Sequence, residues 1–218
     1  MAILLPTRNG YSLAENRTDA IVHLSGIAMG LIAAPTLIGL AVILQHGTAA
    51  IVGTSVYGVA MVAMLVCSAL YNMAQHARRR AFFRHLDHTA IFCKIAATYT
   101  PFVVLSGGQG AWLLTGLWGA AVAGSGLRLF VPDWRLLACA IALGMGWAGM
   151  FAGHDFFDGL STAVIVLIVT GGSLYSIGVG FFLFDRLPFH YTIWHLFVLA
   201  ATAVFYAAVT LQLVQTAA

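Results

Sequence analysis

Polar and ionisable side chains interrupt the apolar sequence between Ser68 and Pro101. Ser68 and Asn72 are four residues apart, so on a helix they share one face at the end of an apolar run. Asp87 opens the next apolar run, and Lys94 follows seven residues later, on nearly the same face two turns deeper. Ionisable groups that far into an apolar helix are costly, and they therefore indicate a functional site.

A second polar pair opens the last apolar run, where Tyr191 and His195 are four residues apart and face the same way. If the apolar runs cross a membrane alternately, this pair shares one depth with Ser68, Asn72 and Asp87. A carboxylate can act as a base, while hydroxyl, amide and imidazole groups donate hydrogen bonds or bind metals. The sequence therefore predicts a polar cavity in the cytoplasmic third of a helical bundle.

The composition predicts that the solvent of this chain is a lipid bilayer. Of 218 residues, 61% are hydrophobic and 8% are charged, and the mean hydropathy is +0.94. The three cysteines, Cys67, Cys93 and Cys139, fall inside apolar runs and are expected to be small buried hydrophobes rather than disulfides or metal ligands. The N-terminus lacks the pattern of a signal peptide, so we expect insertion through an uncleaved first helix.

Seven apolar runs are each long enough to span a hydrocarbon core of about 30 Å. They cover roughly residues 20–45, 49–73, 87–106, 109–131, 134–153, 159–184 and 190–214. We predict an all-α, polytopic membrane protein with a cytoplasmic segment at 1–19 and a seven-helix transmembrane domain at 20–218. The pattern Ser12-x-x-Glu15 resembles a capping box and predicts a short helix before the first span.

The basic residues predict the orientation of the chain. With alternate sides assigned to successive loops, one side holds nine arginines and the other has no Lys or Arg. By the positive-inside rule the N-terminus is cytoplasmic and the C-terminus outside, in the inner (plasma) membrane. The basic loop His76–Arg84 determines topology, and it could also bind anionic lipid headgroups through Arg78, Arg79, Arg80 and Arg84.

The motifs in these segments resemble the haemolysin III proteins, the bacterial branch of the progestin and adiponectin receptor (PAQR) superfamily. The first block reads S-x-L-Y, a basic loop, R-x-L-D-H-x-A-I and T-Y-T-P-F. The second block, I-W-H-L-F-V, lies near the C-terminus. The matching residues are Ser68, Leu70, Tyr71, Leu86, Asp87, His88, Ala90, Ile91, Thr98 to Phe102, and Ile193 to Val198.

This resemblance implies a zinc ion held by three histidines, one ending S-x-x-x-H and two in H-x-x-x-H at the start of the seventh helix. It also implies ceramidase-like hydrolysis of lipid amides in some members. Here Asn72 and Tyr191 stand at two of these positions, and only His195 matches. We therefore expect no zinc at one ion per chain and no other cofactor. A site rebuilt from His195, Asp87 and Tyr191 is the alternative.

Further positions of the resemblance concern the first, third and last helices. His23 matches a family histidine, whereas Asp19 stands where the family usually has Asn, and Phe205 replaces a histidine found in many members. We place His23 and Tyr99 with the cavity residues. A lone histidine on an apolar helix is most often hydrogen-bonded to a neighbouring helix.

Three functions remain open. The first is a lipid-binding, sensing or membrane-homeostasis protein that retains the family's cavity without its zinc chemistry. The second is a hydrolase of lipid amides or esters, with Asp87 and Ser68 as catalytic residues. The third is a pore or proton-coupled permease, prompted by Asp87 and Lys94. All three have membrane lipids as partners and none involves nucleic acid.

Lys94 needs a partner, since lipid exposure of its charge costs roughly 2.5–3.5 kcal/mol or more. Asp87 lies on the same helical face, about 10 Å away along the axis. One hypothesis is that the ammonium pairs with Asp87 and supplies the charge that zinc supplies in the relatives. The alternative is that Lys94 snorkels or bonds carbonyls elsewhere.

Overall fold

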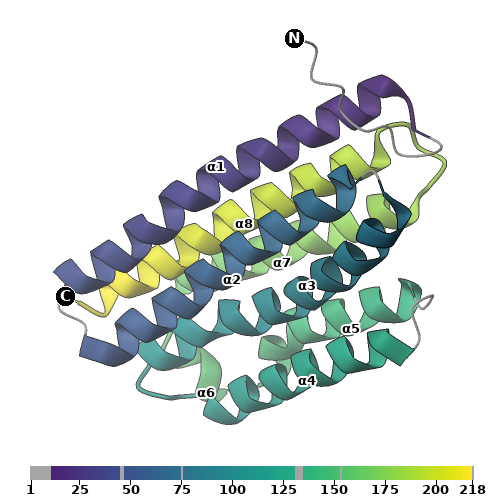
Figure 1. Cartoon of the computed structure of the whole chain (residues 1–218). Helices are drawn as coiled ribbons and strands as arrows, with labels where there is room; N and C mark the ends of the chain where they lie inside the picture. Colours follow the sequence, from purple (N-terminus) through teal and green to yellow (C-terminus); the bar gives the residue numbers. More distant parts are fainter. Residues whose placement is uncertain (1–10, 45–46, 75, 131–134, 153, 218) are drawn as a thin grey trace.

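The computed structural model describes residues 11–44, 47–74, 76–130, 135–152 and 154–217, and every regular element within them is a helix (Figure 1). The elements are α1 (Leu13–Ile43), α2 (Gly47–Met73), α3 (Ala77–Leu105), α4 (Ala111–Phe130), α5 (Arg135–Trp147), the 3₁₀ turn η1 (Ala148–Phe151), α6 (His154–Phe157), α7 (Thr162–Leu183) and α8 (His190–Gln215). The all-α prediction is confirmed for these residues.

Five of these helices are long and apolar enough to cross a membrane, namely α1, α2, α3, α7 and α8, while α4 and α5 are shorter apolar helices. Large apolar side chains cover the outside of the bundle, where Ile32, Val122 and Phe151 are 71%, 72% and 86% exposed. Water would penalise so much exposed apolar surface, whereas acyl chains would not. The chain is therefore a multi-pass membrane protein.

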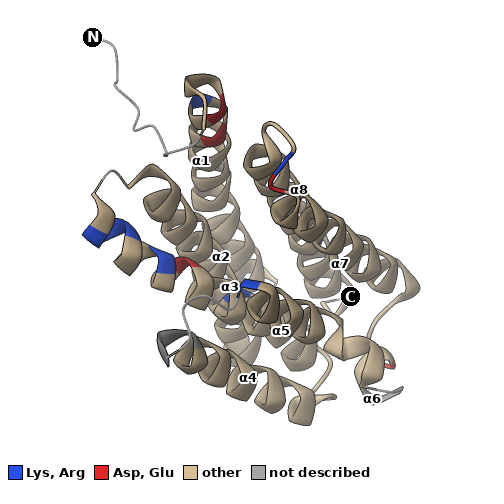
Figure 2. Ribbon diagram, turned by 90° about the vertical axis from the view of Figure 1, so that its right-hand side faces the viewer, with Lys and Arg blue, Asp and Glu red and all other residues tan. Residues whose placement is uncertain are grey.

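The start of α3 differs from the sequence prediction, whereas α1 begins at its predicted capping box. α3 starts at Ala77, so the basic segment is helical, and the prediction of a loop there was wrong. Alanine and arginine are strong helix formers, which explains this extension. Figure 2 shows the basic residues, coloured blue, on the first turns of α3. α1 begins at Leu13 behind a capping box of Ser12 and Glu15. It continues without a break, so the predicted division after residue 19 falls inside a helix.

The helices pack around α3, which contacts α2, α4, α5 and α8. α8 lies between α1 and α7, while α5 contacts both α3 and α7 (Figure 1). Gly26 lets α1 approach α8 closely, because a Cβ at this position would lie 2.6 Å from Leu199 Cδ2. The close contact of α1 and α8 thus depends on the small residue of α1.

Polar contacts join the N-terminal ends of α1 and α8. The Tyr11 hydroxyl lies 2.8 Å from His190 Nε2, and the backbone N–H of Phe189 donates to the Glu15 carboxylate at 2.9 Å. Phe189 adopts a left-handed conformation with φ of 58°, which is uncommon for a bulky residue. Glu15 therefore caps its own helix and also fixes the strained residue that precedes α8.

Candidate functional site

Two neighbouring cavities lie within the bundle and share one wall. The wall consists of Asp87, Ile91, Ala142, Val179, Trp194 and His195. Asp87 comes from α3 and His195 from α8, and both side chains are buried. The structure therefore brings together the acid and the imidazole that the sequence analysis placed at one depth.

The first cavity holds five of the predicted residues. Ser68, Asp87, Lys94, Tyr99 and His195 all contribute to its lining. Most of the remaining wall is apolar or aromatic and includes Met64, Ile95, Leu143, Val198 and Phe205. This cavity thus combines a few hydrogen-bonding groups with a long apolar wall, as binding sites for amphiphilic ligands do.

The second cavity contains the positions at which the resemblance implies zinc ligands. Asn72 and Tyr191 line it together with His195, so these three positions do converge in space. The Asn72 amide donates to the Ser68 carbonyl oxygen at 2.9 Å. An amide and a phenol are poor zinc ligands compared with imidazole, so these residues do not fit the family's three-histidine metal set.

Lys94 is buried, and its ammonium contacts two groups other than Asp87. Nζ donates to Thr98 Oγ1 at 2.8 Å and lies 4.5 Å from the centroid of the Tyr57 ring. The first contact is a hydrogen bond to a hydroxyl, and the second is a cation–π interaction with an aromatic ring. Neither the hydroxyl of Thr98 nor the ring of Tyr57 was named as a partner of Lys94 from the sequence, and the pairing with Asp87 stays a prediction.

Tyr99 has a structural partner as well as a place in the cavity wall. Its hydroxyl donates to the Gly146 carbonyl at 2.6 Å and accepts the Gly149 N–H at 3.2 Å. These bonds fix the end of α5 and the start of η1 against α3. Tyr99 therefore holds the lining of the first cavity in shape.

The arginines proposed for headgroup binding occupy the first two turns of α3. Arg78 and Arg79 are exposed, whereas Arg80 lies over the Tyr71 ring at 5.7 Å and Arg84 lines the second cavity beside Asp87. Of these four arginines, Arg78 and Arg79 therefore face outward, and Arg80 and Arg84 turn toward the body of the bundle.

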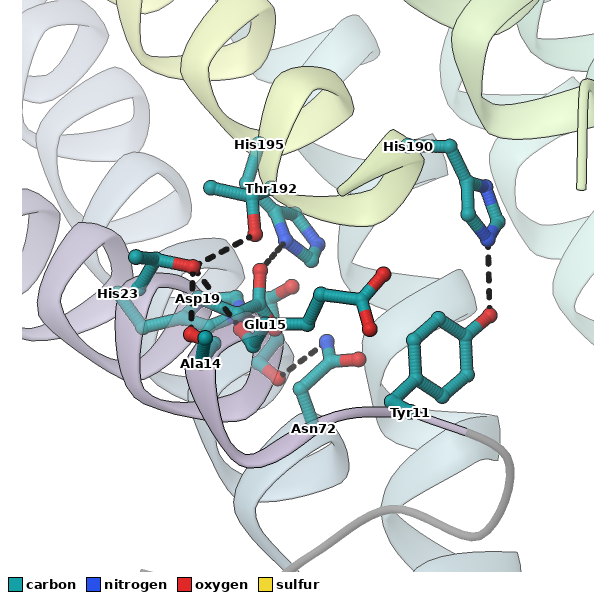
Figure 3. Close-up of polar contacts among 11 residues, drawn as sticks. Tyr11, Ala14, Glu15, Asp19, His23, Asn72, His190, Thr192 and His195 are labelled. Atoms are coloured by element: carbon teal, nitrogen blue, oxygen red, sulfur yellow. Dashed lines mark hydrogen bonds and ion pairs between the residues drawn. The ribbon is translucent and has the colours of Figure 1, made fainter. Parts of the chain in front are cut away.

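The main contact that the sequence analysis missed joins α1 to α8. Asp19 Oδ1 lies 2.5 Å from His195 Nδ1, and Asp19 Oδ2 lies 3.5 Å from His23 Nε2 (Figure 3). The rings of His23 and His195 are 4.2 Å apart. The sequence feature that could have predicted this contact is the i,i+4 spacing of Asp19 and His23, which puts both side chains on one face of α1. His195 thus contacts Asp19 and His23 of α1, in addition to sharing cavity walls with Asp87 and Tyr191.

Comparison with known proteins agrees with the sequence motifs. The family model described as "Haemolysin-III related" matches residues 11–206. "Hemolysin-3" of Bacillus cereus is 36% identical over 216 residues, covering 97% of each chain. "Hemolysin-3 homolog" of Bacillus subtilis (strain 168) is 33% identical over 204 residues, covering 91% of this chain and 94% of the relative.

A more distant relative comes from the animal part of the superfamily. "Monocyte to macrophage differentiation factor" of Homo sapiens is 29% identical over 165 residues, covering 71% of this chain and 67% of the relative. The resemblance to haemolysin III and to the PAQR superfamily is confirmed by these matches. With the family model covering most of the helical bundle, the chain belongs to the haemolysin-III related family.

Proposed function

We propose that this haemolysin III-like membrane protein binds a membrane amphiphile in the first cavity, as a lipid-binding or lipid-sensing protein. The observation that carries the proposal is the mixed lining of the cavity. Ser68, Asp87 and His195 offer hydrogen bonds close to one another, and Val198 and Phe205 extend the wall along α8. A polar head would meet the first group, and an acyl chain would lie against the second.

The family's three-histidine zinc chemistry has no part in this proposal. Asn72 and Tyr191 replace two imidazoles, so that set of residues lacks the ligands for a tightly held zinc ion. Binding instead rests on shape, apolar contact and a few hydrogen bonds. No cofactor is needed for this function.

The test is to fill the cavity and measure bound lipid. Ala142 lines both cavities, so Ala142→Phe should reduce the lipid that native mass spectrometry detects on the purified protein. Ala123→Phe is the matched control, because Ala123 lies on the exposed face of α4. Equal lipid occupancy in the two folded variants would refute the proposal.

A hydrolase of lipid amides or esters is the second candidate. It is favoured by Ser68, Asp87 and His195 lining one cavity, since an acid and an imidazole can carry protons for hydrolysis. Turnover of a fluorescent ceramide by the wild-type protein, lost in Asp87→Asn, is the expected result for this candidate. Lipid retention without turnover would leave binding as the function.

We further propose that α1–α5, α7 and α8 all span the inner membrane, with a cytoplasmic N-terminus and an outer C-terminus. The distribution of arginine supports this, because the nine arginines fall on one side of the alternating spans. α4 and α5 would cross as shorter helices packed against α3. In this orientation the two cavities lie toward the cytoplasmic side.

A further inference from the structure

Asp19, His23 and His195 form a compact cluster between α1 and α8. Each residue offers a potential ligand atom, and these atoms lie within 4.8 Å of one another. His23 and His195 are 5% and 6% exposed, and the Asp19 side chain is 15% exposed. Figure 3 shows the Asp19 carboxylate and the His195 imidazole directed toward each other across the helix interface.

One nitrogen in this cluster lacks a hydrogen bond. His23 Nε2 is buried, and among the described residues no group lies within hydrogen-bonding geometry of it. The nearest charged atom, Asp19 Oδ2, is 3.5 Å away, and the ring faces His195. A buried polar atom without a partner is unfavourable, so this nitrogen is available to a ligand held between the three side chains.

We propose that Asp19, His23 and His195 bind a divalent transition metal ion, with Zn²⁺ as the best match. Two imidazoles and one carboxylate are a common protein ligand set for zinc, and they leave a further position for water. The ion would satisfy His23 Nε2 and replace the proton between Asp19 and His195. It would also neutralise a carboxylate held in an apolar bundle, where an unpaired charge is costly.

The ligand set follows from the local structure of two helices. Asp19 and His23 are four residues apart on α1 and therefore project from the same face. Gly26, one turn further along α1, admits Leu199 of α8, which lies one turn after His195. The close approach at Gly26 thus brings His195 within reach of the two residues of α1.

The site differs from the three positions implied by sequence resemblance. The expectation that the protein lacks zinc rested on Asn72 and Tyr191, and neither belongs to the cluster. The competing explanation is a metal-free contact in which Asp19 and His195 share a proton and hold α1 against α8. Zinc titration separates the two explanations and requires no lipid, so it is independent of the lipid-binding proposal.

The experiment uses the full chain in detergent, stripped with a chelator, reloaded with Zn²⁺ and desalted. We expect one zinc per chain by elemental analysis. Asp19→Asn and His23→Gln should each weaken binding by more than about 100-fold, because changes to groups that merely orient a ligand already cost about 10–100-fold. His76→Gln is the control, since His76 is exposed at the start of α3, and it should bind as the wild type does.

X-ray absorption of the zinc-loaded wild type provides a readout that does not depend on the variants folding. A shell with two imidazole nitrogens and carboxylate or water oxygens would support the proposal. Zinc absent from the wild type after reloading would overturn it, as would a shell without imidazole. Binding by Asp19→Asn and His23→Gln equal to that of His76→Gln would also overturn it and favour the metal-free contact.

Discussion

At the scale of single residues, Lys94 shows how a hydroxyl and an aromatic ring accommodate a buried amine. Its ammonium has the Thr98 hydroxyl and the face of the Tyr57 ring as neighbours. A hydroxyl oxygen accepts from an ammonium, and an aromatic face attracts a cation. The side chain therefore extends toward the deeper half of α3, and Asp87 stays at the wall between the two cavities.

This geometry predicts an energetic coupling between Lys94 and Thr98. In a double-mutant cycle, Lys94→Met and Thr98→Val should show a coupling in the free energy of unfolding of about 0.5–3 kcal/mol, as residues in contact do. The cycle of Lys94→Met with Asp87→Asn should give less than about 0.5 kcal/mol. Denaturant unfolding in mixed micelles measures both cycles. A larger coupling to Asp87 than to Thr98 would contradict this expectation and support the ion pair of Lys94 with Asp87.

At the scale of helices, the interface of α1 and α8 depends on a small residue. A side chain at Gly26 would collide with Leu199 Cδ2 of α8 and would lie 3.3 Å from Leu65 Cδ2 of α2. Gly39 is on the same helix, and a Cβ there would meet no atom within 4 Å. The two glycines thus form a natural pair for comparing a packed position with an open one.

We expect Gly26→Leu to destabilise the protein by about 1–3 kcal/mol, because overpacking forces helices apart. The same change at Gly39 should be neutral or stabilising, since leucine favours the helix more than glycine does. Thermal unfolding in detergent measures the difference between them. Equal unfolding midpoints for the two variants would show that the interface of α1 and α8 tolerates a larger separation.

The helices themselves follow well from hydropathy, whereas contacts between helices do not. The apolar runs predicted the bounds of α2, α7 and α8 to within a few residues, because apolar composition and length alone define a segment that can span a bilayer. The start of α3 was missed, since charged residues that form helices carry no apolar signal. The cluster at Asp19 was missed because it depends on the rotation of α1 against α8, which no local pattern determines.

In the candidate site, the depth of each residue could likewise be predicted from the sequence, whereas side-chain partners on other helices could not. Ser68, Asp87 and His195 were placed together through their common depth, and they do line one cavity. The partner of Lys94 was not determined by the sequence, because side chains on α3 can extend toward either end of the helix. Only the packing of α2 against α3 brings Tyr57 to the ammonium.

At the scale of the whole molecule, polar contacts gather where α1, α5 and α8 begin. Arg135 at the start of α5 binds Asp185 in the turn between α7 and α8, with both oxygens accepting at 2.9 Å. Glu15 and Tyr11 join the starts of α1 and α8. This end of the bundle is therefore a connected polar layer, and it also carries the arginines of α3 (Figure 2).

We expect this polar layer to face the cytoplasm. In a variant without the native cysteines, Arg79→Cys should resist a membrane-impermeant maleimide in intact cells and react after permeabilisation. Gln109→Cys, in the exposed turn between α3 and α4, should react in intact cells. Gel-shift labelling measures both, and the reverse pattern would invert the orientation that we propose.

The position of His195 links ligand binding in the cavities to the contact between α1 and α8. One imidazole borders both cavities and also contacts Asp19 of α1. A molecule that enters a cavity and turns this ring must change the free energy of the contact with α1. By linkage, whatever strengthens or weakens that contact changes the affinity of the cavity by the same factor. A ligand that turns this ring would therefore be coupled to the packing of α1 against α8.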